Sequence, residues 1–124
     1  MPPFLWISLG AILGANLRYL IASAVAKTSL SLFPYSTLLI NISGSFLLGA
    51  FMVWSTERAI VNPRYRLLFA IGFCGSYTTF SSYAFETFAL LEQGRWGGFA
   101  LNIILSNLLC LAAVVSGAVL VRSV

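Results

Sequence analysis

A run of small and hydroxyl-bearing residues at positions 72–83 carries most of the groups that can bind an ion. Its sequence, GFCGSYTTFSSY, lies inside a long apolar segment. Glycine weakens a helix there, and Ser and Thr compete for backbone hydrogen bonds. In hydrocarbon, each backbone group freed by a break is costly unless protein, water or an ion satisfies it. The run therefore predicts either a broken helix that presents carbonyls and hydroxyls to an ion, or a close helix–helix contact of small residues.

Polar side chains also occur singly inside other apolar segments. Asn41 lies well inside one of them, so it needs an interhelical partner or a hydrated path. Arg18 lies near the far end of another, where its side chain either snorkels to the interface or lines a vestibule. Ionisable groups inside a membrane are costly and mark pathways, which makes Arg18 a candidate functional residue.

Helical spacing groups further polar residues. Asn102 and Ser106 are four positions apart and share one stripe of a helix. Glu86 follows Tyr83 by one helical turn and can face the same side. The alternative for Glu86 is a partner for a hydroxyl, or for Arg18, in a packed bundle.

Four long apolar segments must position these residues. They cover residues 4–26, 35–54, 67–91 and 97–121. A membrane span needs about 20 residues, so each segment is long enough. Trp6, Trp54 and Trp96 lie at segment ends, as interfacial anchors do. The predicted fold class is an all-α membrane protein with four transmembrane helices, the third broken at its centre, in a single domain over residues 1–124.

Composition supports a membrane protein. The chain has 124 residues, of which 60% are hydrophobic and 8% are charged. A soluble domain carries about 25% charged residues and needs them to cover its surface. The N-terminus lacks the basic region and cleavage site of a signal peptide. We therefore expect a multi-pass protein of the plasma (inner) membrane from which nothing need be removed.

The flanking charges predict orientation only weakly. The N-terminal side carries Arg58, Arg64, Arg66 and Arg122, and the opposite side carries Lys27 and Arg95. Four against two is a small positive-inside bias. It favours cytoplasmic termini and also permits copies that insert both ways. Anionic lipid headgroups account for the net charge of +4 without nucleic acid as a partner.

Signatures of enzymes and metal clusters are missing from the sequence. It has no histidine, and Cys74 and Cys110 form no Cys-x-x-Cys motif. Its carboxylates, Glu57, Glu86 and Glu92, form no close sequence pair. We expect no enzymatic activity, no zinc site and no disulfide framework, and we interpret both cysteines as small packing residues.

Two patterns of small residues suit close helix or subunit contacts. The first runs from Gly10 to Gly14 and the second from Ser45 to Gly49. Such spacing places two small residues on one helix face, where a neighbouring backbone can approach.

Three ordered motifs resemble the small fluoride channels of the Fluc or CrcB family. They are GANLRY at 14–19, STLLINISGSF at 36–46, and GFCGSYTTFSSY at 72–83. The resemblance covers all four apolar segments. The chain departs from the family pattern at four positions: Ser36 and Ser76 replace Gly, Ser82 replaces Thr, and Tyr83 replaces Phe.

The resemblance implies an antiparallel homodimer that arises from dual-topology insertion and has two pores. Such a dimer exports fluoride passively and holds a structural Na⁺ at its centre. Backbone carbonyls at the broken third helix bind this Na⁺, and the matching positions are Gly75 and Thr78.

The resemblance also assigns a fluoride pathway. Its matching residues are Asn41, Phe80, Ser81, Ser82, Tyr83, Glu86 and Ser106. Amide and hydroxyl donors can replace the hydration of a small anion. Aromatic ring edges carry the positive part of the ring quadrupole, so Phe80 and Tyr83 can face an anion without a fixed charge.

Two other classes remain open from sequence. One is a small dual-topology exporter of cationic drugs, which needs a carboxylate in the first segment to couple protons. The first segment holds Arg18 and no carboxylate. The other is a membrane subunit with a structural role. Ion flux from purified protein in liposomes separates both from a channel.

Overall fold

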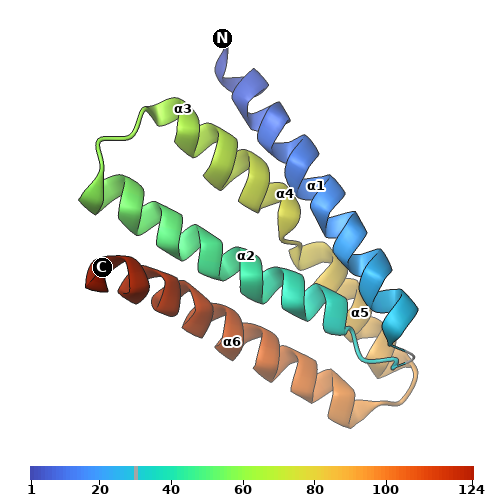
Figure 1. Cartoon of the computed structure of the whole chain (residues 1–124). Helices are drawn as coiled ribbons and strands as arrows, with labels where there is room; N and C mark the ends of the chain where they lie inside the picture. The colour runs from blue at the N-terminus through green and yellow to red at the C-terminus, as the bar shows by residue number, and fades with distance from the viewer. Residues whose placement is uncertain (30) are drawn as a thin grey trace.

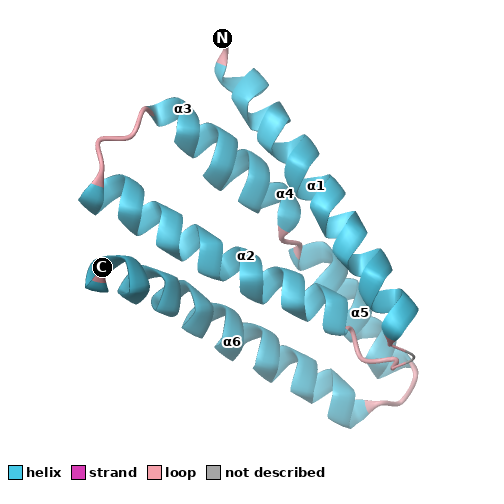
Figure 2. Ribbon diagram, viewed as in Figure 1, coloured by secondary structure: helices cyan, strands magenta, loops and turns pink. Residues whose placement is uncertain are grey.

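The computed structural model describes residues 1–29 and 31–124, and this part of the chain consists of helices and loops without a strand (Figures 1 and 2). The first helix is α1 (Pro3–Thr28), and the second is α2 (Tyr35–Val53), continued by a π-helical turn, η1 (Trp54–Arg58). The third contains α3 (Pro63–Arg66), the π-helical η2 (Leu67–Cys74), α4 (Gly75–Tyr77) and α5 (Phe80–Glu92). The last is α6 (Trp96–Ser123).

The third helix is broken between α4 and α5, as the sequence predicted. Thr78 and Thr79 have extended backbone conformations, with φ −81° and ψ 158° at Thr78 and φ −150° and ψ 117° at Thr79. The Thr79 hydroxyl then accepts a hydrogen bond from the backbone N–H of Ser82, 3.2 Å away, and so caps α5. Figure 2 shows the break as a short loop inside the third helix. Within the described residues, the other three helices are each continuous and apolar enough to span a membrane.

Two tightly packed helix pairs build the bundle. In Figure 1, α1 runs beside α3, η2 and α4, and α2 runs beside α6. Gly10 and Gly14 of α1 face the backbone of η2 so closely that an added Cβ would clash with Leu68 or Phe73. The glycine pattern of the first segment therefore makes the close helix contact that the sequence predicted.

Glycines likewise let α2 approach α6. A Cβ on Gly49 would clash with the backbone at Val114, and one on Gly117 would clash with the backbone at Phe46. The second small-residue pattern thus contributes Gly49 to the contact with α6, and Gly117 of α6 lies against Phe46 and Ala50 of α2.

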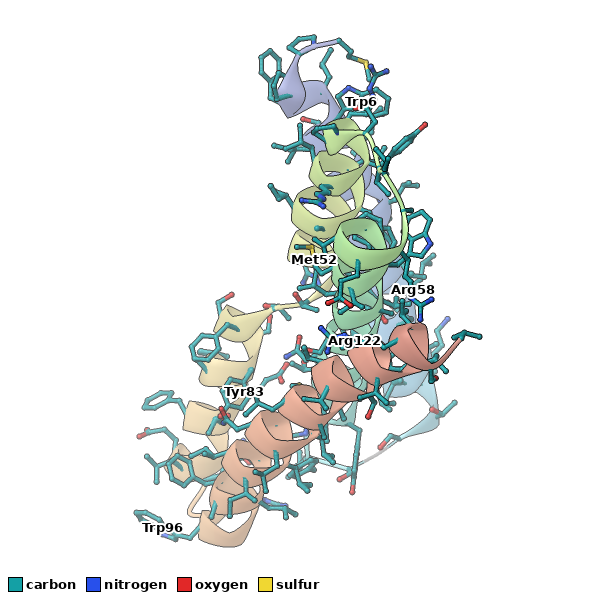
Figure 3. The ribbon with its side chains drawn as sticks, turned by 90° about the vertical axis from the view of Figure 1, so that its left-hand side faces the viewer. Trp6, Met52, Arg58, Tyr83, Trp96 and Arg122 are labelled. Atoms are coloured by element: carbon teal, nitrogen blue, oxygen red, sulfur yellow. The ribbon has the colours of Figure 1, made fainter. Side chains whose placement is uncertain are left out.

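The outer surface of the bundle is apolar. Large side chains such as Ile12 and Leu20 on α1 and Leu111 on α6 are 59%, 61% and 66% exposed. Trp6 and Trp96 lie toward opposite ends of the bundle in Figure 3. Exposed apolar residues over several helices, with tryptophans toward both ends, suit a bundle surrounded by hydrocarbon.

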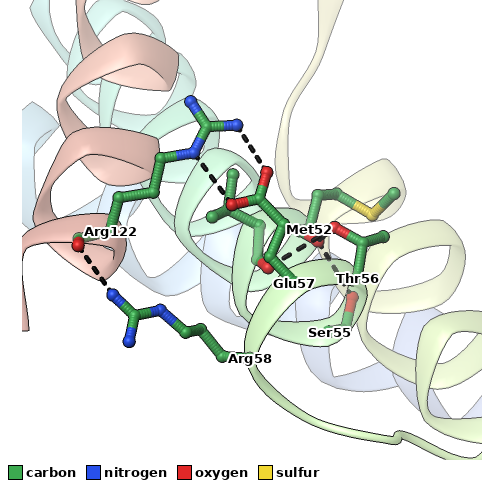
Figure 4. A network of polar contacts seen from close by, with 7 residues as sticks. Met52, Ser55, Thr56, Glu57, Arg58 and Arg122 are labelled. Atoms are coloured by element: carbon green, nitrogen blue, oxygen red, sulfur yellow. Dashed lines mark hydrogen bonds and ion pairs between the residues drawn. The ribbon is translucent and has the colours of Figure 1, made fainter.

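Charged residues tie η1 to the end of α6. Arg122 forms a two-pronged ion pair with Glu57, with Nη2–Oε1 and Nε–Oε2 distances of 2.6 and 3.0 Å (Figure 4). Arg58 donates through Nη2 to the carbonyl of Arg122 at 2.6 Å. An exposed ion pair contributes only about 0–1 kcal/mol, so this network sets geometry more than stability.

We predict that the contact between α1 and η2 tolerates no added methyl group. Gly14→Ala should lower the free energy of unfolding by about 1–3 kcal/mol, because the new Cβ meets the Phe73 backbone. The control is Gly97→Ala in α6, where the added Cβ meets open space. Thermal unfolding in detergent, followed by circular dichroism, measures both variants. Equal melting temperatures for Gly14→Ala and the wild type would contradict this packing.

Candidate functional site

The break in the third helix is held by the side-chain amide of Asn41. Its Oδ1 accepts a hydrogen bond from the backbone N–H of Thr79 at 2.8 Å. Its Nδ2 donates to the Thr79 carbonyl at 3.0 Å. The amide thus supplies an acceptor for the Thr79 N–H, which has no helical partner at the break, and an additional donor to the Thr79 carbonyl, the N-cap carbonyl of α5. One hydrogen of Nδ2 is not used by Thr79.

Arg18 reaches the same break from α1. Its Nε donates to the carbonyl of Ser76 at 3.1 Å, and the side chain is half-buried. This carbonyl lies in the last turn before the break, where helical N–H donors run out. The contact gives Arg18 a structural role in the bundle, and its place in a vestibule stays a prediction.

The carbonyls of Gly75 and Thr78 are left without partners. In a continuous helix they would accept from the N–H groups of Thr79 and Ser82, but these donate to Asn41 and to the Thr79 hydroxyl. Among the described residues, neither carbonyl accepts a hydrogen bond from another group. Gly75 is exposed. Neutral carbonyl oxygens are suitable ligands for a hard monovalent cation, so the two predicted Na⁺ positions fit that role chemically.

A groove of about 360 Å³ lies between α2, the break, α5 and α6. It is lined by five of the residues that the sequence singled out: Asn41, Thr78, Phe80, Tyr83 and Ser106. These residues come from three helices that are distant in sequence. The groove also contains Asn107, which sequence analysis did not select.

The two aromatic residues of the groove are neighbours. The ring centroids of Phe80 and Tyr83 are 5.4 Å apart, with an angle of 57° between the ring planes. Phe80 is 78% exposed. Tyr83 projects from α5, and its hydroxyl lies 3.5 Å from Nδ2 of Asn107 on α6 (Figure 3).

Ser106 begins a buried chain of hydrogen bonds between α6 and α5. Its hydroxyl donates to Oδ1 of Asn102 at 3.3 Å, and Nδ2 of Asn102 donates to the Thr87 hydroxyl at 2.8 Å. Thr87 donates in turn to the Tyr83 carbonyl at 2.6 Å. Asn102 is 1% exposed. The shared stripe predicted for Asn102 and Ser106 is therefore a direct contact, in which the Ser106 proton points at Asn102.

The remaining predicted residues lie outside this groove. Ser81 is exposed, with its hydroxyl 3.4 Å from that of Thr79, and the N–H of Ser82 bonds the same Thr79 hydroxyl. Glu86 lines a second cavity of about 330 Å³ near the end of α1 and the start of α2. The structure thus brings five of the predicted residues together and places these three elsewhere on α5.

Glu86 has a hydroxyl partner in the bundle, which is one of the two partners that the sequence analysis proposed for it. Thr37 donates to Oε1 of Glu86 at 2.8 Å. The second oxygen, Oε2, is buried and has no hydrogen-bond partner among the described residues. Arg18, the other partner proposed for Glu86, bonds Ser76 instead. The hydroxyl of Thr37 is therefore the partner of Glu86.

Tyr77 has a packing role that was not predicted from the sequence. The residue is 3% exposed, and its ring stacks on Phe73, with ring centroids 5.6 Å apart. Its hydroxyl lies 2.8 Å from that of Ser43 on α2. Phe69, Phe73 and Tyr77 recur at every fourth position, and this spacing is the signal that would have shown one continuous aromatic face leading to the break.

Comparison with known proteins identifies relatives over nearly the whole chain. Residues 5–118 match the family described as "CrcB-like protein, Camphor Resistance (CrcB)". A protein of Koribacter versatilis named "Fluoride-specific ion channel FluC" is 56% identical over 98% of this chain and 96% of its own length. A protein of the same name from a Sulfurihydrogenibium species is 41% identical over 98% of both chains. Another, from Methylococcus capsulatus, is 45% identical, and the match covers 51% of its length.

We predict that Asn41 stabilises the break. Asn41→Leu keeps the side-chain size but removes both hydrogen bonds to Thr79, and each polar group left without a partner costs about 1–3 kcal/mol. The matched control is Asn16→Leu, because Asn16 is exposed and bonds only the Ile12 carbonyl of its own helix. The melting temperature in detergent should fall for Asn41→Leu and stay near wild type for Asn16→Leu. If both variants melt like the wild type, Asn41 is not a structural clamp.

Proposed function

Because the chain belongs to the CrcB family, we propose that it is a fluoride-selective ion channel that exports cytoplasmic fluoride passively down its electrochemical gradient. The chain is a multi-pass membrane protein and not an enzyme. The observation that carries the proposal is the groove, which two adjacent aromatic rings line together with the Asn41 amide. The names of the relatives support the identity of the ion.

The groove suits a small anion because it offers weak, neutral contacts. Ring edges of Phe80 and Tyr83 present partial positive charge, and Asn41 retains an N–H that Thr79 does not use. Such groups can replace the hydration of fluoride without the strong attraction of a fixed cation. An ion that is bound weakly at several sites can also leave, as conduction requires. Ser81, Ser82 and Glu86 would extend the pathway along α5 beyond the groove.

We further propose that two chains assemble as an antiparallel homodimer with two pores. Phe80 and Gly75 are both exposed in the single chain, although one belongs to the aromatic pair and the other carries a free carbonyl. A second copy would cover both residues and close the open side of the groove. The weak charge bias of the connectors is compatible with insertion in both orientations.

The proposed dimer centre holds a structural Na⁺. The Gly75 and Thr78 carbonyls would bind it, and two chains would together supply four neutral oxygens. The bound cation would compensate backbone groups that the helix break leaves without donors. Its role is to fix the break and the subunit contact, whereas fluoride moves along the groove.

The first prediction here concerns assembly. Several lysines added to one connector should lock every copy in a single orientation and abolish fluoride flux, because inverted partners are then missing. Coexpression of oppositely locked copies should restore flux. The measurement is fluoride efflux from liposomes, with gel filtration to report assembly. Full activity from one locked orientation would rule out the inverted dimer.

The second prediction concerns sodium. Replacement of Na⁺ on both sides of the membrane by a large organic cation should slow fluoride efflux over time, because the carbonyls at the break lose their ligand. Return of Na⁺ should restore the rate. The control is the same exchange in liposomes that contain a fluoride-conducting ionophore. Unchanged efflux after exhaustive Na⁺ removal would count against the site.

The third prediction tests the proposed function at the aromatic pair. Phe80→Ile and Tyr83→Ile remove a ring edge but keep apolar bulk, so each should lose most fluoride efflux while the protein stays folded. Tyr83→Phe should stay conductive because it keeps the ring. Phe85→Ile is the matched control, since Phe85 is 71% exposed on the same helix and does not line the groove. Wild-type efflux in both Phe80→Ile and Tyr83→Ile would contradict a role of the two rings in fluoride transport and would indicate that they serve packing only.

A further inference from the structure

The hydroxyl of Tyr83 is held from one side by Asn107. Nδ2 of Asn107 donates to the carbonyl of Ile103 at 2.8 Å and to Oη of Tyr83 at 3.5 Å. Each of the two amide hydrogens therefore has an acceptor. The short bond to Ile103 fixes the orientation of the amide, so its nitrogen rather than its oxygen faces the tyrosine.

This arrangement determines what Tyr83 offers to the groove. Its oxygen accepts from Asn107, and its own proton has no acceptor among the described residues. Two other hydroxyls that line the groove are already committed as donors. Ser106 donates to Asn102, and Thr78 donates to the Cys74 carbonyl at 2.8 Å. Tyr83 therefore supplies an O–H donor beside two hydroxyls, those of Ser106 and Thr78, that direct their protons away.

We propose that Asn107 is a positioning residue that directs the Tyr83 hydroxyl proton into the groove, so that this ring binds the anion through O–H as well as through its edge. The inference rests on the proposed fluoride channel. A hydroxyl that accepts one hydrogen bond is also a stronger donor in the next, so Asn107 both orients and strengthens the Tyr83 donor. The family pattern has phenylalanine at position 83, so this donor distinguishes the present chain.

The same geometry makes the inference testable without loss of the fold. A distance of 3.5 Å is at the long limit for a hydrogen bond, and Asn107 is exposed. Removal of the contact should therefore cost little stability. Asn107→Ala deletes the amide, and Asn107→Leu deletes it while keeping side-chain bulk, so either variant can report the effect.

The experiment is a double-mutant cycle on fluoride efflux from liposomes over a series of fluoride concentrations. It compares the wild type, Asn107→Ala, Tyr83→Phe and the double variant. Asn107→Ala should raise the half-saturating fluoride concentration about threefold with tyrosine at 83, and should not change it with phenylalanine there. Leu108→Ala is the control, because this exposed neighbour on α6 does not line the groove. Gel filtration and melting temperature report the fold of each protein.

Each outcome decides the inference. If Asn107→Ala shifts the half-saturating fluoride concentration equally with tyrosine and with phenylalanine at position 83, Asn107 acts on packing. If it shifts this concentration in neither background, Asn107 has no part in binding. Either result overturns the proposal. If the wild type conducts fluoride and the effects of the two substitutions are additive, the proposed role of Asn107 is wrong and the proposed channel function stands. If the wild type carries no fluoride at all, the proposed function fails and this inference fails with it.

Discussion

The structure depends on partners for the backbone groups at the break in the third helix. In hydrocarbon an unsatisfied N–H or C=O costs several kcal/mol, so a break survives only where protein or an ion replaces the lost bonds. Asn41 satisfies both groups of Thr79, and Arg18 satisfies the Ser76 carbonyl. The carbonyls of Gly75, Tyr77 and Thr78 accept no hydrogen bond among the described residues, and those of Gly75 and Thr78 are the predicted Na⁺ ligands. The same few contacts therefore hold the helix break and define its candidate ion ligands.

Close helix packing brings those side chains within reach. Arg18 lies one turn after Gly14, and because Gly14 lets α1 approach the η2 backbone, the guanidinium can reach Ser76. Gly44 follows Asn41 by three residues, and a Cβ on it would clash with the Thr78 side chain. Helices separated by larger side chains would hold both polar groups too far from the break. The small residues are thus as necessary to the site as the residues that bind.

The sequence was sufficient for the helices and for the break, because length, hydropathy and helix-weakening residues act locally. The predicted first segment, 4–26, lies within α1, and the run at 72–83 contains the two extended threonines. The partners of the polar side chains could not be predicted in the same way. Arg18 bonds Ser76 and Glu86 bonds Thr37, and both pairings depend on the rotation of each helix about its axis, which no short motif encodes. The direction of the Ser106 proton is likewise set by Asn102 and Thr87, two side chains that meet only in the folded bundle.

The placement of charge bears on how such a groove can serve an anion. The residues that line it include no charged side chain. Arg18, the basic residue that contacts the break, donates a hydrogen bond to the Ser76 carbonyl. A guanidinium facing the groove would attract an anion strongly but would also slow its release. In the proposed pathway, the rings of Phe80 and Tyr83 and the Asn41 amide would divide the attraction among weak dipoles instead. Arg18 thus contributes its charge to the break, on the side of α1, and the groove between α2, α5 and α6 is lined by neutral residues.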